Sequence, residues 1–388
     1  MQTTRAPLNR LVWVLLLLVL TFATAPAQAS ELIELDLSSP LVDTSAPGGT
    51  VTEGPRPLYC YVRLPDGYDQ YKGRRYPVLW LLHGANGDAT RWNLDDFAGL
   101  NAILVMPEGG VFGMYTDWYN DGAFGTPQWA TYQLDYVRDE IHKRFRILPE
   151  RRWHAIAGIS MGGQGALRFA SLLPGYFGSV AGWSPAFANT QAPEAVFGIP
   201  AVTGYAYEAI FGPADGAYAT GMSPFALAAN MEHTRVYLLS GDGNNCPGDP
   251  MTATFDLDVI TEKAIRHQQA PYAAELRAAG ADVTTREPCG VHTFGVWTRA
   301  IADVRATWGF FAPVAESPRQ WTYRTAALSG EMWGLDFSFA EHPTELAEFT
   351  RDGTRLFATG TGTVTITGAR GCRFTAELPF ARRLPAGC

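Results

Sequence analysis

The residue best suited to chemistry is Ser160, which lies in the sequence GISMG and so matches the pattern G-x-S-x-G. In that pattern the serine occupies a sharp turn between a strand and a helix, and small neighbours allow the two elements to approach closely. The apolar run HAIAGI precedes the turn and the helical sequence GGQGALRFA follows it. The pattern also arises by chance, and a purely structural turn is the alternative. In this context the sequence predicts that Ser160 is a nucleophile and that the N–H of Met161 holds the oxyanion.

A second oxyanion donor should follow an earlier strand, and the sequence LLHGANGD has the required form. We expect the N–H of Ala85 to serve, with Asn86 as the alternative. His83 is expected to shape this turn by hydrogen bonding and not to act as the base, since the chain order Ser, acid, His puts the base late. We also count His83 and Asn86 among the residues expected to surround the substrate.

The base should be a histidine, and His233, His267 and His292 follow Ser160 before His342 in the tail. His233 precedes a strand and His267 lies in a polar helical stretch, so both are expected to be solvated. His292 follows a strand-like segment and a Cys-Gly turn, ahead of the final helix. Because reactive groups in sheets of this kind collect at the carboxyl ends of the strands, we expect His292 to be the general base.

A third group must orient the imidazole and stabilise its charged form. Asp242 directly follows an apolar strand, which is the commonest place for such an acid. Asp256, Asp258 and Glu262 come slightly later, in and before a helical stretch. Spacing alone favours Asp242.

The elements that must position these side chains alternate between strands and helices. The apolar runs end in glycine, proline or polar turn residues and do not alternate in polarity, which is typical of strands buried on both faces. They cover residues 76–84, 101–110, 154–159, 179–185 and 234–243. Helical patterns cover residues 133–145, 162–173 and 259–280, with a last helix within 292–311. The sequence therefore predicts an α/β fold with a mostly parallel sheet and helices on both faces.

The pattern changes after about residue 317, where ESPRQ forms a linker-like break. The tail is rich in Thr, Val and Phe with interspersed glycines, and it alternates with a period of two. We therefore expect a catalytic domain at residues 30–316 and a small β-rich domain at residues 317–388.

The first residues indicate export. Arg5 and Arg10 precede the apolar run LVWVLLLLVLTFATA, and the sequence AQA then fits a cleavage site. We expect residues 1–29 to be a signal peptide cut after Ala29, with an uncleaved membrane anchor as the alternative. The expected location is extracellular or in the cell envelope.

The formal net charge of −8 disfavours nucleic acid and anionic membrane surfaces as partners. Export permits disulfides, and five cysteines leave one thiol unpaired. Two pairings are expected, because the members of each pair lie in neighbouring loops or in the tail. We expect neither a metal nor a cofactor, and we expect a monomer. The expected disulfides join Cys246 to Cys289 and Cys372 to Cys388, and they leave Cys60 as a buried free thiol.

Six segments, VMPEGGVFGMYTDWY, GISMGG, IFGPADGAYATGMSP, TRVYLLSGDGNN, TEKAIR and HTFGVW, form a recognisable set. Together they resemble the antigen-85 mycolyltransferase family and its wider relatives, the secreted esterases of the esterase D and feruloyl esterase type. The likeness runs from about residue 50 to 312 and does not cover the tail. The DWY segment and the interval from serine to histidine are its most specific parts.

The resemblance implies an α/β-hydrolase fold and a Ser-Glu-His triad. Matching TEKAIR to the acid-bearing helix of the family brings Glu262 to the position of the acid, thirty residues before His292. This implication replaces the preference for Asp242 that spacing gave. The resemblance also supports Ala85 and Met161 as the oxyanion donors.

Asp117, Trp118 and Tyr119 are expected to line the acyl or acceptor site, with core packing of the two aromatic side chains as the alternative. The chain departs from the mycolyltransferases at His83, where the family has an Asp that helps to bind its sugar acceptor. It also has two glycines after Ser-Met where the family has two alanines, which is more like the general esterases. A trehalose acceptor is therefore not implied for this chain.

The expected function is that of a secreted serine esterase or acyltransferase. It would act on carboxylic esters, expected to be lipid or cell-envelope acyl esters, and pass the acyl group to water or to a hydroxyl acceptor. One alternative is a non-catalytic protein that binds envelope material or glycans on the same scaffold. A peptidase with the same three side chains is the other.

Overall fold

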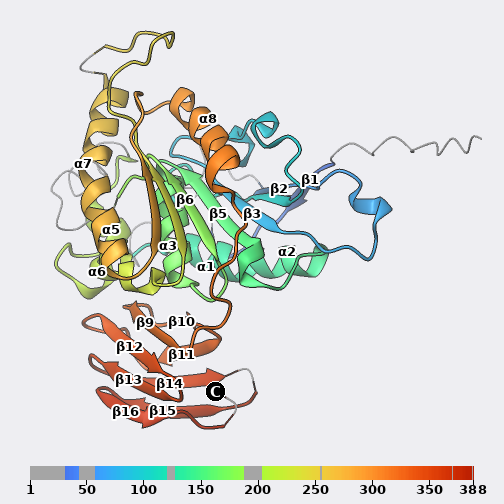
Figure 1. Ribbon diagram of the computed structural model, residues 1–388. Coiled ribbons are helices and arrows are strands. Elements are labelled where there is room, and N and C mark those ends of the chain that lie inside the picture. The colour runs from blue at the N-terminus through green and yellow to red at the C-terminus, as the bar shows by residue number, and fades with distance from the viewer. Residues whose placement is uncertain are drawn as a thin grey trace, which may run out of the picture.

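The computed structural model describes residues 31–42, 57–119, 127–187, 203–253, 256–368, 370–386 and 388 (Figure 1). The expected signal peptide lies outside the described residues. The main sheet has eight strands in the order β1-β2-β4-β3-β5-β6-β7-β8. The neighbours from β4 to β8 are parallel, whereas β2 is antiparallel to both of its neighbours, β1 and β4. The strands are β1 (Leu32–Asp36), β2 (Tyr59–Arg63), β3 (Val78–Leu82), β4 (Ile103–Met106), β5 (His154–Ile159), β6 (Ser179–Trp183), β7 (Arg235–Leu239) and β8 (Asp282–Arg286).

Helices connect these strands and cover the sheet. The α-helices are α1 (Trp129–Thr131), α2 (Arg138–Arg144), α3 (Met161–Leu172), α5 (Tyr207–Phe211), α6 (Ala217–Met222), α7 (Leu257–Ala278) and α8 (Phe294–Asp303). Two π-helical segments are η4 (Tyr132–Val137), which joins α1 to α2, and η7 (Val304–Trp308) after α8. The 3-10 turns are η1 (Tyr68–Gln70), η2 (Ala89–Arg91), η3 (Leu94–Phe97), η5 (Arg151–Trp153) and η6 (Ala228–Met231).

The strands are apolar on both faces because both faces are covered. In β3 all five residues are buried, and they alternate between two hydrophobic clusters. Val78, Trp80 and Leu82 belong to the cluster that also contains side chains of α2, α3 and α7. Leu79 and Leu81 belong to the second cluster, which also contains side chains of α8 and η3. The predicted mostly parallel sheet with helices on both faces is confirmed. β1 was not anticipated, and it forms one edge of the sheet, where the burial of its residues alternates.

The tail forms two antiparallel four-stranded sheets, in the orders β10-β11-β14-β15 and β16-β13-β12-β9. Inward-facing residues of both sheets form one hydrophobic cluster, as in a β-sandwich. The predicted β-rich tail is confirmed as structure, while its independence as a domain stays a prediction. The strands are β9 (Gln320–Thr325), β10 (Ser329–Met332), β11 (Leu335–Phe339), β12 (Ala347–Asp352), β13 (Arg355–Thr359), β14 (Thr363–Gly368), β15 (Arg373–Glu377) and β16 (Phe380–Arg383).

The β-sandwich packs against the carboxyl end of α3. The side-chain amide of Asn230 donates to the carbonyls of Ser171 and Arg324, and its oxygen accepts the N–H of Arg324 at 2.7 Å. The hydroxyl of Tyr323 donates to the carbonyl of Leu172 at 3.1 Å. The helix that follows Ser160 is therefore held at its far end by the tail.

Both expected disulfides form, Cys246–Cys289 and Cys372–Cys388. Cys60 is a buried free thiol in β2, and burial raises its pKa, so it is protonated at neutral pH. No helix within the described ranges combines the length and the apolar character needed to cross a membrane.

Candidate active site

Ser160 occupies the turn between β5 and α3 with a backbone φ of 53° and ψ of −120°. Residues other than glycine rarely adopt a positive φ, and such a conformation costs on the order of 1–3 kcal/mol. The turn is also crowded. A Cβ added to Gly162 would collide with the carbonyl oxygen of Leu82, and one added to Gly158 would collide with the backbone of Gly162. The small residues of the pattern are therefore required by close backbone packing.

The hydroxyl of Ser160 meets the imidazole that the sequence singled out. Nε2 of His292 lies 2.8 Å from Oγ of Ser160, and Nδ1 of His292 lies 2.7 Å from Oε2 of Glu262. Since the Glu262 carboxylate accepts the proton on Nδ1, Nε2 is left with a lone pair that accepts the hydroxyl of Ser160. The three side chains thus form one continuous hydrogen-bonded chain.

Glu262 is fully buried on α7, where the neighbouring buried positions Val259 and Ile265 are apolar. A buried carboxylate must have its lone pairs satisfied. Its Oε1 accepts the hydroxyl of Ser184 at 2.7 Å and also the N–H of Gly241, while Oε2 faces His292. These three donors satisfy the buried carboxylate.

The other candidate acids serve other contacts. The carboxylate of Asp242 accepts the N–H of Asn244 at 2.8 Å and that of Gly290 at 3.2 Å. Asp256 caps the start of α7 through the N–H of Asp258 at 2.9 Å. Asp258 contributes its carbonyl oxygen, which accepts the backbone N–H of His292 at 3.1 Å. The preference that spacing alone gave to Asp242 is therefore wrong for this structure.

The loop after β3 lies beside the serine. A Cβ added to Gly84 would lie 3.3 Å from Cβ of Ser160. The N–H of Asn86 donates to the carbonyl of Val111 at 3.0 Å, which removes Asn86 as the alternative donor. Met161 is the first residue of α3, so its N–H has no acceptor within that helix. The geometry therefore favours the N–H groups of Ala85 and Met161 as the pair that faces Ser160.

His83 is completely buried beneath this loop. Its Nε2 accepts the N–H of Gly109 at 2.9 Å, and its Nδ1 therefore carries the proton and donates to the carbonyl of Gly84 at 2.9 Å. The hydroxyl of Tyr115 donates to the carbonyl of His83 at 2.9 Å, and burial raises the pKa of Tyr115. His83 shapes the turn as expected. Its assignment to the substrate site is corrected, because it has neither exposed surface nor a free ring nitrogen.

In the DWY segment, Asp117 and Trp118 make structural contacts, whereas the ring of Tyr119 is exposed. Both carboxylate oxygens of Asp117 are engaged by Thr131, at 3.0 Å to its N–H and 2.7 Å to its hydroxyl. Trp118 is buried, donates from Nε1 to the carbonyl of Gly113 at 3.2 Å and packs edge-on against Tyr205. Core packing, the stated alternative, therefore fits Trp118. Tyr119 is half exposed, so of the three it has the most surface available to a substrate.

Ser184 and Trp297 belong to this site and were missed in the sequence. The hydroxyl of Ser184 accepts the Nε1–H of Trp297 at 3.0 Å while donating to Glu262, and the ring of Trp297 lies edge-on to that of His292. The available signal was the position of Ser184 directly after β6, at the same edge of the sheet as Ser160.

Comparison with known proteins decides the family. The family model named Esterase matches residues 52–307, well over half of the chain. The chain belongs to the Esterase family.

Two relatives illustrate the range of the family. The chain is similar to Esterase Rv1288 of Mycobacterium tuberculosis strain ATCC 25618 / H37Rv, with 29% identity over 251 residues that cover 60% of this chain and 52% of that protein. It is also similar to the diacylglycerol acyltransferase/mycolyltransferase Ag85C of Mycobacterium leprae strain TN, with 24% identity over 278 residues that cover 63% of this chain and 79% of that protein. The match thus spans about half the length of Rv1288. The resemblance seen in the sequence is confirmed.

Solved structures agree on the fold. The crystal structure of MPT51 from Mycobacterium tuberculosis has a TM-score of 0.56 at 20% identity, over 73% of this chain and 100% of that chain. The fluorophosphonate-binding serine hydrolase FphF of Staphylococcus aureus has a TM-score of 0.52 at 20% identity, over 70% of this chain and 97% of that chain. At these identities the likeness establishes the α/β-hydrolase fold alone.

The strain at the Ser160 turn predicts a stability difference between two variants that both lack the hydroxyl. Glycine adopts a positive φ without steric cost, whereas alanine does not. We expect Ser160→Gly to exceed Ser160→Ala in free energy of unfolding by about 1 kcal/mol, measured by urea denaturation. On the exposed face of α7 the order should reverse, so Ala274→Gly should be destabilising. A Ser160→Gly variant no more stable than Ser160→Ala would contradict the strain argument.

Proposed function

We propose that the chain is a serine esterase that forms an acyl-enzyme on Ser160. The observation that carries the proposal is the continuous chain of short hydrogen bonds from Ser160 through His292 to Glu262. Nucleophilic catalysis requires a base within hydrogen-bonding reach of the nucleophile and a third group that orients the base. Ser160, His292 and Glu262, from distant parts of the chain, have the contacts that these two requirements call for.

In the first half of the reaction, Oγ of Ser160 attacks the ester carbonyl while its proton passes to Nε2 of His292. The carbonyl oxygen becomes an oxyanion, which accepts the N–H groups of Ala85 and Met161. Glu262 holds the imidazole in the required tautomer and stabilises its charged form. His292 then returns the proton to the departing alkoxide, the C–O bond to it breaks, and the acyl group remains on Ser160.

In the second half, His292 takes a proton from the incoming nucleophile, which attacks the acyl carbonyl. His292 then protonates Oγ of Ser160 as the acyl–serine bond breaks. Water as the nucleophile gives hydrolysis, and an alcohol gives acyl transfer. The names of the relatives include both an esterase and an acyltransferase, so the same chemistry supports both outcomes.

The expected setting is outside the cytoplasm. The signal peptide predicted at residues 1–29, the disulfides and the names of the antigen-85-type relatives support an exported enzyme that acts on lipid or cell-envelope acyl esters. A monomer without a cofactor remains the expectation. The rival hypothesis, a non-catalytic envelope or glycan binding protein, requires an incomplete set of catalytic groups. The assembled Ser, His and Glu argue against it.

The role of Glu262 can be tested with Glu262→Gln. An amide at this position no longer stabilises the charged imidazole and favours the wrong tautomer, so kcat for a short p-nitrophenyl ester should fall by roughly 10²- to 10⁴-fold. Ser160→Ala should reduce activity further, by roughly 10⁴- to 10⁶-fold. Glu275→Gln, on the exposed face of the same helix, is the matched control and should leave kcat unchanged. A Glu262→Gln enzyme with nearly full kcat would rule out Glu262 as the acid.

The acceptor can be tested by a series of p-nitrophenyl esters of increasing acyl chain length, each assayed alone, with trehalose and with glycerol. His83 replaces the family's sugar-binding Asp and is buried, so we expect no gain in p-nitrophenol release with trehalose and no trehalose ester by mass spectrometry. Glycerol needs no dedicated site and serves as the control for interception by a small alcohol. Formation of trehalose esters would establish an acyltransferase with a sugar site that lies elsewhere.

A further inference from the structure

The loop that carries His292 has little support from the sheet. It follows β8, which is an edge strand with a single neighbour, β7, and which is mostly half buried or exposed. The loop from residue 287 to 293 must nevertheless hold Nε2 at 2.8 Å from Oγ of Ser160. Since a misplacement of about 1 Å can cost roughly 100-fold in rate, something other than the sheet must fix this loop.

The loop that follows β7 supplies the missing contacts. The N–H of Asp242 donates to the carbonyl of Pro288 at 2.9 Å, and the N–H of Gly243 donates to that of Gly290 at 2.9 Å. In return, the N–H of Gly290 donates to the carboxylate of Asp242 at 3.2 Å. Gly290 has a backbone φ of 145°, a conformation that residues with a side chain rarely adopt. These hydrogen bonds must therefore hold the backbone in that conformation.

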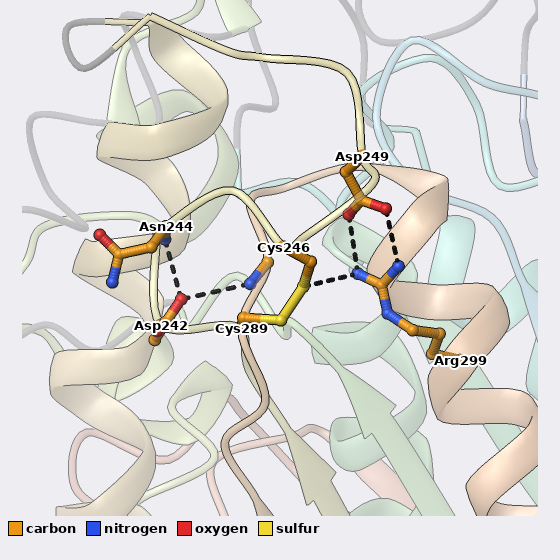
Figure 2. The surroundings of a disulfide bond; sticks show 7 residues. Asp242, Asn244, Cys246, Asp249, Cys289 and Arg299 are labelled. Atoms are coloured by element: carbon orange, nitrogen blue, oxygen red, sulfur yellow. Dashed lines mark hydrogen bonds and ion pairs between the residues drawn. A yellow bond between two sulfur atoms is a disulfide. The ribbon is translucent and has the colours of Figure 1, made fainter.

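A covalent bond joins the same two loops (Figure 2). Cys246 and Cys289 form a disulfide with a Cα–Cα distance of 5.2 Å, and Cys289 lies three residues before His292. Figure 2 also shows Arg299 of α8 directed at this bond, with a contact of 3.2 Å to Sγ of Cys246. The guanidinium also makes a bidentate ion pair with Asp249 at 3.1 and 3.0 Å. This ion pair anchors the loop after β7 to α8.

The β7–α7 loop also touches the acid. The N–H of Gly241, next to Asp242, donates to Oε1 of Glu262. One loop therefore contacts both the acid and the segment that carries the base. Burial acts to raise the pKa of Asp242, but the hydrogen bonds from Asn244 and Gly290 lower it overall, so its carboxylate is charged at neutral pH.

We propose that Asp242 and the Cys246–Cys289 disulfide form a brace that positions His292 against Ser160 and Glu262. They act on the rate through His292 and do not contact substrate, so they are positioning residues. The inference deepens the proposed function and rests on it. It also gives Asp242, which spacing had favoured as the acid, a distinct role at the same edge of the sheet.

The test compares two double variants that each remove both cysteines of one disulfide, so that Cys60 remains the one unpaired thiol among the described residues. Loosening the His292 loop should slow chemistry without weakening binding, so Cys246→Ser with Cys289→Ser should lower kcat for a p-nitrophenyl ester about tenfold and leave KM within about twofold. Cys372→Ser with Cys388→Ser removes the bond in the β-sandwich and should leave both constants near wild type. Near-UV circular dichroism normalises each rate to folded protein.

A second pair separates positioning from general destabilisation. Asp242→Ala removes the acceptor of the Gly290 N–H and should lower kcat about tenfold, with KM again unchanged. Asp242→Asn keeps an acceptor oxygen at this position and should restore most of kcat. This pair decides the matter where the disulfide variant does not fold.

The proposal is overturned if the folded Cys246→Ser, Cys289→Ser enzyme keeps its kcat within twofold, or if the β-sandwich variant loses as much. It is also overturned if Asp242→Asn is as impaired as Asp242→Ala, or if neither is impaired. Hydrolysis by wild type that persists in Ser160→Ala would reject the proposed function itself. If Ser160→Ala abolishes hydrolysis but the brace variants do not affect it, the brace alone is rejected.

Discussion

The buried carboxylate of Glu262 is the constraint on which the site depends. A charge with no exposure to water is costly unless donors surround it, and here two donors come from Ser184 and the Gly241 backbone. The third is the ring N–H of His292. Satisfying this carboxylate therefore orients the imidazole, and the orientation in turn presents a lone pair to Ser160. One burial requirement thus determines the direction of the whole hydrogen-bonded chain.

The fold meets this requirement by gathering the carboxyl ends of parallel strands at one edge. Ser160 and Ser184 directly follow β5 and β6, and His292 follows β8 after a short loop. Glu262 is different, because it projects from the buried face of α7 and not from a strand end. The loop after β7 links the strand-end residues to the helix residue, since it contacts both Glu262 and the segment that carries His292.

Features that depend on a local sequence pattern were predicted from the sequence. Features that depend on which side of a helix or loop turns inward were not. Ser160 and His292 stand beside recognisable strands and turns, and the structure brings them together as expected. The acid was not predictable from spacing, because the helical phase of α7 decides which side chain turns inward, and only the family resemblance pointed to Glu262. The same difficulty explains His83, since a loop sequence does not reveal that its ring is buried under the backbone it shapes.

We expect this arrangement to make one hydroxyl, that of Ser160, reactive among all the serines of the chain. The most direct measurement is intact-protein and peptide mass spectrometry after incubation with a fluorophosphonate, which reacts covalently with an activated serine. We expect a single adduct per molecule, located on the peptide that contains Ser160, and no adduct in Ser160→Ala. An unlabelled wild-type protein, or an adduct on another serine that persists in Ser160→Ala, would contradict it.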